Sequence, residues 1–253
     1  MTEWFAQSPY GVRFEWGLAG AAALAASSSC LVIVDVLSFT TSVTIAVEAG
    51  TRVFPYAWRD KTAAGFARQH QAQLAVGRGS ASAASPWTLS PASLRRAPFT
   101  PRLVLPSPNG SAISAAASGG GATVIAACLR NASAVGRWLA EHGSGTPRGP
   151  VTVIAAGERW PDGTLRLALE DLLGAGAVIA ALGEHGRMRL SPEADAARAC
   201  FEATAGVAAA VANSASGREL TGSGFADDVA IAVEVNACRA VPVLTDRAFT
   251  AAR

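Results

Sequence analysis

The sequence is short of the residues on which several common kinds of site depend. It has three histidines, four cysteines and, in Lys61, a single lysine among 253 residues. The cysteines lie far apart and never form C-x-x-C, so neither a zinc ribbon nor a disulfide framework is expected. The motifs G-x-x-x-x-G-K-[ST] and G-x-G-x-x-G are also missing. Their absence argues against a P-loop or a Rossmann nucleotide site.

The chain also lacks a strong excess of charge. Its 21 basic and 19 acidic residues give a net charge of +2, so neither a nucleic acid nor a membrane surface is an expected partner. No charge-free run of about 18 apolar residues exists, which argues against a spanning helix. Leu18–Ala26 resembles the apolar part of a signal peptide, but Glu3 and Glu15 and only one basic residue, Arg13, precede it. A secretory signal begins with a basic segment, so we expect a cytoplasmic protein.

What the sequence does contain is an alternation of short apolar runs and helical patterns. Buried parallel strands are predicted at Leu31–Val34, Leu103–Leu105, Thr123–Ala127 and Val151–Ala155. Helices are predicted at 38–50, 131–142, 167–182 and 192–212, further strands at 51–57 and 74–76, and a long loop at 77–101. This alternation predicts an α/β fold of three layers, with a mostly parallel sheet and helices on both faces. We expect one domain over residues 1–253, which could divide into two lobes at a waist near 143–150.

The stretch Leu-Pro-Ser-Pro-Asn-Gly-Ser, residues 105–111, stands between a predicted strand and a helical run. Asn109 and Gly110 can adopt a positive φ, as a tight turn requires. Ser107, Asn109 and Ser111 place short polar groups beside the free N–H groups of a helix N-terminus, which favours anions and phosphate above all. Ser107, Asn109, Gly110 and Ser111 are therefore candidate phosphate-binding residues, although an ordinary turn explains the same pattern.

Charged residues follow the other predicted strands. Asp35 ends the first, Arg130 follows the third, and Glu158 and Arg159 follow the fourth. Ligands of open α/β sheets bind outside the carboxyl ends of the strands, so we expect these side chains to share one crevice with the 107–111 turn. Carboxylates suit Mg²⁺ and guanidinium groups suit phosphate, a combination used in phosphoryl transfer. Asp35, Arg130, Glu158 and Arg159 are therefore the candidate catalytic residues.

Simpler interpretations of the acidic residues stay open. Asp35 can cap the helix that follows it, and Glu158 can pair with Arg159 on a surface loop. Glu170 and Asp171 are neighbours on a predicted helix and cannot both face the core, so one of them is expected to be solvated. Asp227-Asp228 is expected to cap or solvate a turn.

Taken in order, several motifs resemble those of the 2-phosphosulfolactate phosphatase family of coenzyme M biosynthesis. Val32-Ile-Val-Asp-Val-Leu-Ser-Phe-Thr-Thr41 resembles its V-x-D-V-L-R-A-T-T, and Ser107-Pro-Asn-Gly-Ser111 its S/T-x-N-G-T turn. Leu169-Glu-Asp and the following Ala-Gly-Ala resemble its L-E-D-x-x-x-A-G-A, and residues 216–243 its C-terminal stretch. The resemblance, over residues 30–245, implies an α/β fold, a Mg²⁺ cofactor and hydrolysis of a phosphate ester of a small sulfonated acid.

On that basis we expect Asp35, with Glu170 or Asp171, to hold Mg²⁺. Thr40 and Thr41 join the candidate phosphate-binding residues. Water is the expected acceptor of the phosphoryl group, while a covalent step at Asp35 stays open. The expected partner is a small phosphorylated acid, and a homo-oligomer is compatible with the sequence.

Four positions depart from the family pattern. Its Arg after D-V-L is Ser38 here, the Asp and Asn of its G-F-D-x-G-N-S-P loop fall on Ala81 and Ala84, and the His of its H-G falls on Ser216. A cation, a carboxylate and an imidazole are thus absent from places that could touch phosphate, metal or sulfonate. We therefore expect weak or absent activity on 2-phosphosulfolactate itself and a better fit for a less charged phosphate ester. The other interpretation is that this loop is solvated and another arginine, such as Arg218, supplies the missing charge. The alternative is a non-catalytic binder of a phosphorylated metabolite, or a scaffold that has kept only the fold.

Overall fold

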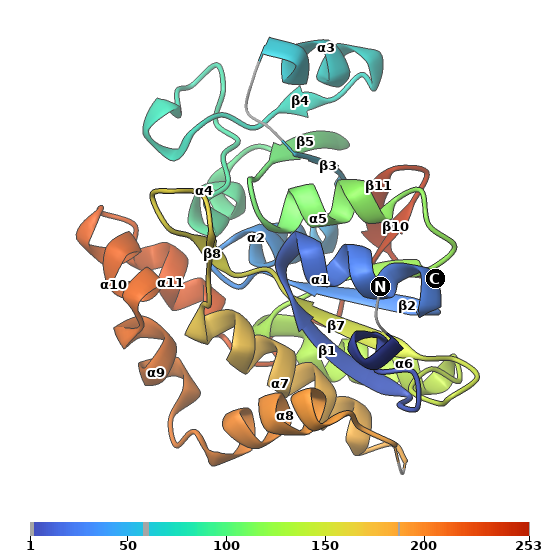
Figure 1. Cartoon of the computed structure of the whole chain (residues 1–253). Helices are drawn as coiled ribbons and strands as arrows, with labels where there is room; N and C mark the ends of the chain where they lie inside the picture. Colours follow the sequence, from blue (N-terminus) through green and yellow to red (C-terminus); the bar gives the residue numbers. More distant parts are fainter. Residues whose placement is uncertain (1–2, 58–60, 187, 253) are drawn as a thin grey trace.

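The computed structural model describes residues 3–57, 61–186 and 188–252. Within these ranges a mixed sheet of nine strands has the order β1-β7-β2-β6-β10-β11-β3-β5-β4 (Figure 1). Its strands are β1 (Val12–Trp16), β2 (Cys30–Val34), β3 (Arg52–Tyr56), β4 (Gln73–Leu74), β5 (Arg102–Pro106), β6 (Thr123–Ala127), β7 (Val151–Ala155), β10 (Pro242–Thr245) and β11 (Ala248–Ala251). A separate hairpin joins β8 (Glu158–Arg159) to β9 (Leu165–Arg166).

Helices cover both faces of the sheet, as the alternating pattern predicts. They are α1 (Gly17–Leu24), α2 (Phe39–Glu48), α3 (Lys61–Gln69), α4 (Pro91–Arg96), α5 (Gly110–Ala117), α6 (Ala132–Glu141), α7 (Leu169–Gly183), α8 (Pro192–Ala203), α9 (Val207–Asn213), α10 (Ala215–Gly222) and α11 (Ala226–Ala232). None of the helices in the described ranges combines enough length with enough apolar sequence to span a bilayer.

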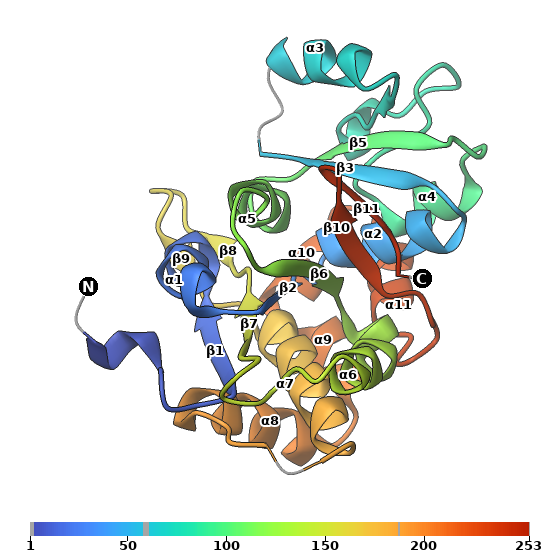
Figure 2. The same cartoon turned by 90° about the vertical axis from the view of Figure 1, so that its right-hand side faces the viewer.

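Strand β2, in the central sheet, shows why a strand of this fold is apolar at every position. Leu31 and Ile33 belong to a core shared with α1, α2 and α5, whereas Val32 and Val34 belong to a second core shared with α6, α7 and α8. Successive side chains of a strand point to opposite faces, so a strand covered on both faces has to be apolar at every position. Figure 2 shows the two groups of helices on opposite sides of β2 and β7, which confirms the three-layer architecture.

The sheet is mostly parallel, but its parallel strands fall into two groups. Strands β1, β7, β2 and β6 run parallel to one another, and so do β3, β5 and β4. The β10–β11 hairpin joins the groups through three antiparallel pairings. The four predicted strands were expected to run parallel to one another in one set. This is wrong for β5, which belongs to the other group, because the C-terminal hairpin inserts between β6 and β3.

Several other boundaries differ from the prediction. Residues 192–212 form two helices, α8 and α9, with a break at Gly206, whose φ is +78°. The predicted loop 77–101 contains α4, and β1 and the C-terminal hairpin were not predicted as strands.

Helix α7 confirms the 3.6-residue pattern of 167–182. Residues 143–150 form the loop from α6 to β7, and β7 lies beside β2 in the same sheet.

Candidate active site

Asp35 lies directly after β2 and joins two helix N-termini. Its Oδ1 accepts a hydrogen bond from the N–H of Phe39 at 2.9 Å, and its Oδ2 accepts one from the N–H of Gly110 at 2.8 Å. The carboxylate thus caps α2, as the simpler interpretation expects, and it also holds the first residue of α5. The turn after β5 therefore meets the end of β2, although the two strands belong to different parallel groups.

Gly110 is needed for this close approach and not for its backbone angles. A Cβ at this position would lie 2.6 Å from Cδ1 of Phe39 and 2.7 Å from Oδ2 of Asp35. The expected positive φ is not found, since Asn109 has a φ of −107° and Gly110 is not left-handed. The sequence therefore identified the right glycine for the wrong reason.

Three hydroxyls expected to contact phosphate are used inside the protein instead. Thr40 Oγ1 exchanges hydrogen bonds with the backbone of Asp35, donating to its carbonyl oxygen at 2.7 Å and accepting from its N–H at 2.9 Å. Thr41 donates to the carbonyl oxygen of Val36, and Ser111 donates to that of Leu105. All three threonine and serine side chains are fully buried. They fix the positions of Asp35 and of the turn, because their hydroxyls already have partners.

A cavity of about 410 Å³ opens where these segments meet. Its walls contain four of the predicted site residues, Asp35, Ser107, Asn109 and Glu158. The remaining lining residues are Leu37, Ser38, Ala57, Arg78, Leu89, Pro106 and Pro108. Two carboxyl groups, a guanidinium group and the turn before α5 thus face one space.

Arg78 is a cavity residue that the sequence reasoning missed. Its Nη2 donates to Oγ of Ser38 at 2.8 Å, and its Nε lies 3.2 Å from Oδ2 of Asp228. Asp228 is 1% exposed and also accepts hydrogen bonds from Ser90 and from the N–H of Ala92 in the first turn of α4. Of the two residues expected to cap or solvate a turn, Asp228 therefore caps α4 and is not solvated, whereas the side chain of Asp227 is exposed. The aspartate holds the guanidinium group in place. Arg78 is the only arginine or lysine between positions 68 and 95, a signal that could have drawn attention to it.

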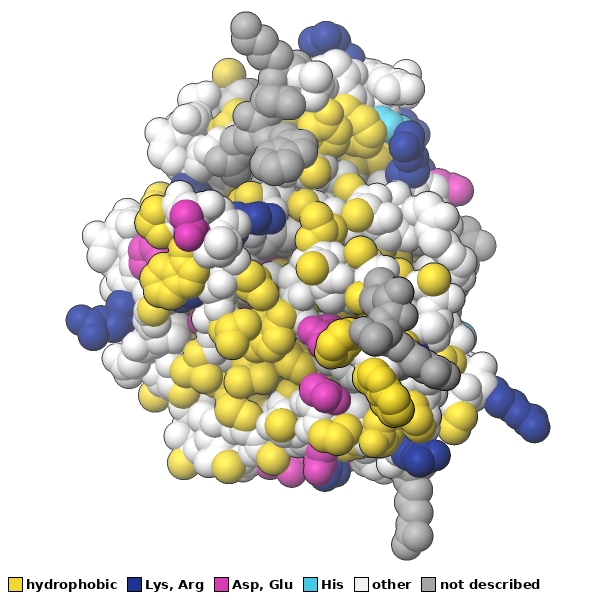
Figure 3. Space-filling view, in the orientation of Figure 1, with side chains coloured by type: hydrophobic (Ala, Val, Ile, Leu, Met, Phe, Trp, Pro, Cys, Tyr) yellow, Lys and Arg dark blue, Asp and Glu magenta, His cyan; other side chains and the backbone are white. Residues whose placement is uncertain are grey.

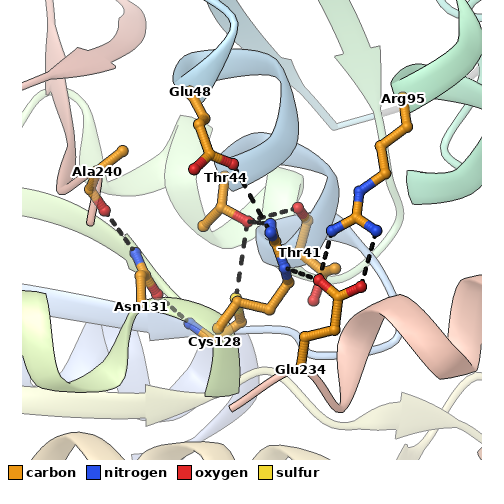
Figure 4. Close-up of polar contacts among 9 residues, drawn as sticks. Thr41, Thr44, Glu48, Arg95, Cys128, Asn131, Glu234 and Ala240 are labelled. Atoms are coloured by element: carbon orange, nitrogen blue, oxygen red, sulfur yellow. Dashed lines mark hydrogen bonds and ion pairs between the residues drawn. The ribbon is translucent and has the colours of Figure 1, made fainter. Parts of the chain in front are cut away.

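Arg130 does not reach the cavity. It is 2% exposed, and its Nε lies 3.2 Å from Glu234 and its Nη2 3.6 Å from Glu48, while Nη1 donates to Thr44. Figure 4 shows Thr44 and Glu48 of α2 on one side of this network and Glu234, which also pairs with Arg95, on the other. The 3₁₀ turn that follows β6, at 129–131, directs Arg130 to the C-terminal half of α2. Asp35 lies at the opposite end of that helix, so Arg130 acts in the structure as part of an ion-pair network.

Arg159 also lies outside this cavity. Its side chain is exposed on the β8–β9 hairpin, where Nη1 donates to the carbonyl oxygen of Gly163 at 3.1 Å. It does not pair with Glu158, which instead accepts a hydrogen bond from Nδ2 of Asn109 at 2.9 Å. The predicted surface pair is therefore wrong, because the hairpin turns the two side chains to different surroundings.

Glu158 is the cavity acid with a pKa near neutrality. Burial disfavours its charged form, and the nearby Asp35 adds repulsion, so its pKa rises from 4.5 to about 7. Burial also raises the pKa of Asp35 and outweighs the hydrogen bonds from Phe39 and Gly110 and the charge of Arg78, which lower it. A carboxyl group that titrates near pH 7 can both take up and release a proton under physiological conditions.

Glu170 and Asp171 lie behind the cavity and are both buried, at 2% and 3% exposure. Asp171 accepts hydrogen bonds from the N–H groups of Val36 and Gly157, at 2.7 and 2.8 Å, and so clamps the segments after β2 and β7. Glu170 accepts a hydrogen bond from Ser214. The expectation that one of the two is solvated is wrong, because the first turn of α7 lies between the strand ends and the α9–α10 connection. Burial, with repulsion from Asp35 and Glu170, holds the pKa of Asp171 well above its ordinary value.

The four carboxyl groups Asp35, Glu158, Glu170 and Asp171 form an acidic cluster with little local compensation. Within the described ranges none of them has an ion pair within 4 Å, and the nearest cations act at longer range. This excess of negative charge fits a divalent cation. No three His, Cys, Asp or Glu side chains among the described residues converge to hold a metal by themselves. Mg²⁺, however, commonly binds through one or two carboxylates, waters and phosphate oxygens, so the donor set fits Mg²⁺ in that manner.

A second arginine, Arg166, acts on the acidic cluster. Nη2 of Arg166 donates to Oγ of Ser216 at 3.0 Å, and its charge opposes the rise in the pKa of Glu158. Ser38 and Ser216, the positions at which the chain departs from the family's Arg and His, are thus each hydrogen-bonded by an arginine, Arg78 and Arg166. By contrast Ala81 and Ala84, at the other two departures, are exposed.

Comparison with known proteins agrees with the ordered motifs. A protein-family model described as 2-phosphosulpholactate phosphatase matches residues 21–247, a range that includes every residue of the acidic cluster and the turn before α5. No curated protein matches the chain closely enough to count as a relative. Because the family model covers most of the 253 residues, the chain belongs to the 2-phosphosulfolactate phosphatase family.

Proposed function

We propose that this protein is a Mg²⁺-dependent phosphatase that hydrolyses small phosphate monoesters, an activity like that of its family. The observation that supports it most is the cavity in which Asp35, Glu158 and Arg78 face the turn before α5. This arrangement combines a metal-binding carboxylate, a proton-transfer group and a fixed cation. Those are the components that hydrolysis of a phosphate ester needs.

Arg78 and the turn before α5 are the proposed binding groups for the phosphate. A guanidinium group forms strong, charge-assisted hydrogen bonds with phosphate oxygens, and Arg78 is already oriented by Asp228 and Ser38. Ser107 and Asn109 add polar groups to the cavity lining. Arg78 takes the role of neutralising developing charge that the sequence analysis gave to Arg130 or Arg159.

Asp35 is the proposed metal-binding carboxylate, and the buried acids Glu170 and Asp171 lie outside the cavity lining. Bound Mg²⁺ would polarise a phosphoryl oxygen and lower the pKa of a coordinated water. Two backbone N–H groups hold Asp35 in one orientation. Glu158, with its pKa of about 7, exchanges the proton that must move between water and the leaving oxygen.

A phosphate-release assay over small phosphate monoesters, both phosphorylated acids and esters of uncharged alcohols, with Mg²⁺ and with a chelator, tests this proposal. We expect chelator-sensitive turnover that Asp35→Asn and Arg78→Gln each reduce by about a hundredfold or more, since each removes a charged group from the reacting site. Arg198→Gln, at a surface ion pair on α8, is the control. Turnover that persists in chelator would refute the metal-dependent mechanism.

The alternative function is non-catalytic binding of a phosphorylated metabolite. The observation in its favour is the exposure of Ala81 and Ala84, which leaves the segment aligned with the family's G-F-D-x-G-N-S-P loop without side chains in the cavity. The same assay separates the two functions. Thermal stabilisation by phosphorylated compounds without any phosphate release would support the binder.

A further inference from the structure

A second cavity, of about 390 Å³, adjoins the first. It lies between α1, α5 and the β8–β9 hairpin, and its walls are mainly apolar. The principal apolar lining residues are Trp16, Leu18, Ala112, Ile113, Ala156 and Leu165. Figure 3 shows hydrophobic side chains gathered on this face of the molecule, around the positions of α1 and β8 in Figure 1. Its volume is in the range of small-molecule sites.

The two cavities share one hydrogen-bonded pair of lining residues. Asn109 and Glu158 line both of them, and Nδ2 of Asn109 donates to Oε2 of Glu158 at 2.9 Å. A molecule whose phosphate lies between Arg78 and Asp35 can therefore extend past this pair into the apolar cavity. The proposed proton-transfer group, Glu158, would then lie at the ester linkage.

The charges of the second cavity disfavour a second anion. Its two charged lining residues among those described are Glu158 and Arg159. Glu158 and Arg159 together give the lining no excess of positive charge, and Arg159 stands on the exposed β8–β9 hairpin, where Nη1 donates to the carbonyl oxygen of Gly163. An anion buried without a cationic partner is costly, whereas an uncharged hydrocarbon gains from leaving water.

We infer that the second cavity binds the apolar part of the substrate, so that the protein acts on phosphate monoesters of uncharged aliphatic or aromatic alcohols. This inference rests on the proposed function, because it takes the phosphate site from it. It assigns the group beyond the phosphate to the cavity formed by α1, α5 and the β8–β9 hairpin. A substrate with a second anion, such as a sulfonated acid, would leave this cavity unused.

Binding of n-alkylphosphonates tests the inference without requiring turnover. Inorganic phosphate and methyl-, butyl- and hexylphosphonate are titrated calorimetrically into the protein with Mg²⁺. We expect affinity to rise by about two- to fourfold for each added methylene until the cavity is filled. A carboxyalkyl phosphonate of the same length should bind more weakly than its alkyl counterpart. Equal affinity along the series, tighter binding of the carboxylated compound, or no binding of any compound would overturn the inference.

A cavity-filling variant locates the effect. Ala22 lines the second cavity and is exposed, so Ala22→Phe fills the space without entering the core. It should abolish the gain with chain length and leave the affinity for inorganic phosphate within about twofold. Ala23→Phe, one residue along α1 and outside the lining, is the matched control and should keep the gain. A chain-length gain that survives Ala22→Phe would place the hydrocarbon elsewhere and overturn the assignment.

Two further outcomes distinguish an apolar substrate subsite from the proposed phosphatase activity and from a contact between two copies of the chain. If alkylphosphonates bind with the expected dependence but the corresponding alkyl phosphates are not hydrolysed, the proposed phosphatase activity fails while the apolar subsite stands. If the affinity series is flat and Ala22→Phe instead changes the sedimentation behaviour of the protein, a second copy of the chain covers the cavity and the inference is wrong.

Discussion

Replacing Glu158 by glutamine removes one ionisable group from the cavity and keeps an oxygen that can accept the hydrogen bond from Asn109. The pKa of Glu158 is raised from 4.5 to about 7, by burial first and by Asp35 second. The folded protein therefore holds this proton more tightly than the unfolded chain does. Its contribution favours folding at low pH and is lost as the pH rises from 4.5 through about 7.

The size of the effect follows from that difference in pKa. At about 1.4 kcal/mol per pKa unit, the ionised side chain costs the wild-type protein about 3 kcal/mol above pH 8, with burial limiting the screening by solvent. Glutamine does not ionise and avoids this cost. The free energy of unfolding of Glu158→Gln minus that of the wild type should therefore increase by about 3 kcal/mol between pH 4.5 and pH 8, and then level off.

Urea denaturation of both proteins across this pH range, with a chelator present, provides the measurement. The other raised carboxyl groups, Asp35 and Asp171, are present in both proteins, so the difference isolates Glu158 except for their mutual coupling. Glu202→Gln, at an exposed position of α8, controls for the substitution itself. A difference between the proteins that does not change with pH would show that Glu158 is not a buried, raised acid, and the proposed proton-transfer role would lose its support.

The remaining predictions concern the junction at Asp35 and the two arginines. Gly110→Ala should lower the free energy of unfolding by about 2 kcal/mol or more in urea titrations, because its Cβ would overlap Phe39 and Asp35; Gly119→Ala, with nothing within 4 Å, should not. Arg130→Gln should cost about 2 kcal/mol of stability, because it removes the buried cation that pairs with the partly exposed Glu48 and Glu234, yet leave phosphate affinity within about twofold. Arg78→Gln should show the opposite pattern, with phosphate affinity reduced by about tenfold or more; equal effects of the two substitutions would contradict their separation. Steady-state kinetics should give a clearly lower kcat/KM for 2-phosphosulfolactate than for an alkyl phosphate, and a preference for the sulfonate would show that its binding groups lie elsewhere.

Local patterns in the sequence predicted which segments form strands and helices. They did not predict which strands lie side by side in the sheet. The five residues of β2 are apolar at every position, and that pattern alone predicts a strand covered on both faces. Nothing local says that the hairpin β10–β11 pairs between β6 and β3. The partner of a strand depends on contacts between residues far apart in the chain, so the split into two parallel groups could not be predicted.

The residues of the candidate site also fall into two groups, those that local sequence could identify and those whose position depends on distant parts of the chain. Asp35, Asn109 and Glu158 could be found because each stands at the end of a recognisable strand or at a helix start. Arg78 could not be placed, since its position depends on Asp228, 150 residues away. Glu170 and Asp171 were misjudged together because helical periodicity describes one buried face, whereas the first turn of α7 is enclosed on two sides.

The contact between Arg78 and Ser38 bears on how divergent members of this family are recognised. The guanidinium group of Arg78 contacts Ser38, the residue that stands where the family motif has Arg, from a segment 40 positions later in the chain. A comparison that scores the motif position by position records only that the arginine after D-V-L is missing. A comparison that asks whether any arginine contacts the residue after D-V-L would find Arg78 there. Chains that fail the motif at this position are therefore better sorted by the surroundings of their first strand's end than by the residue that follows D-V-L.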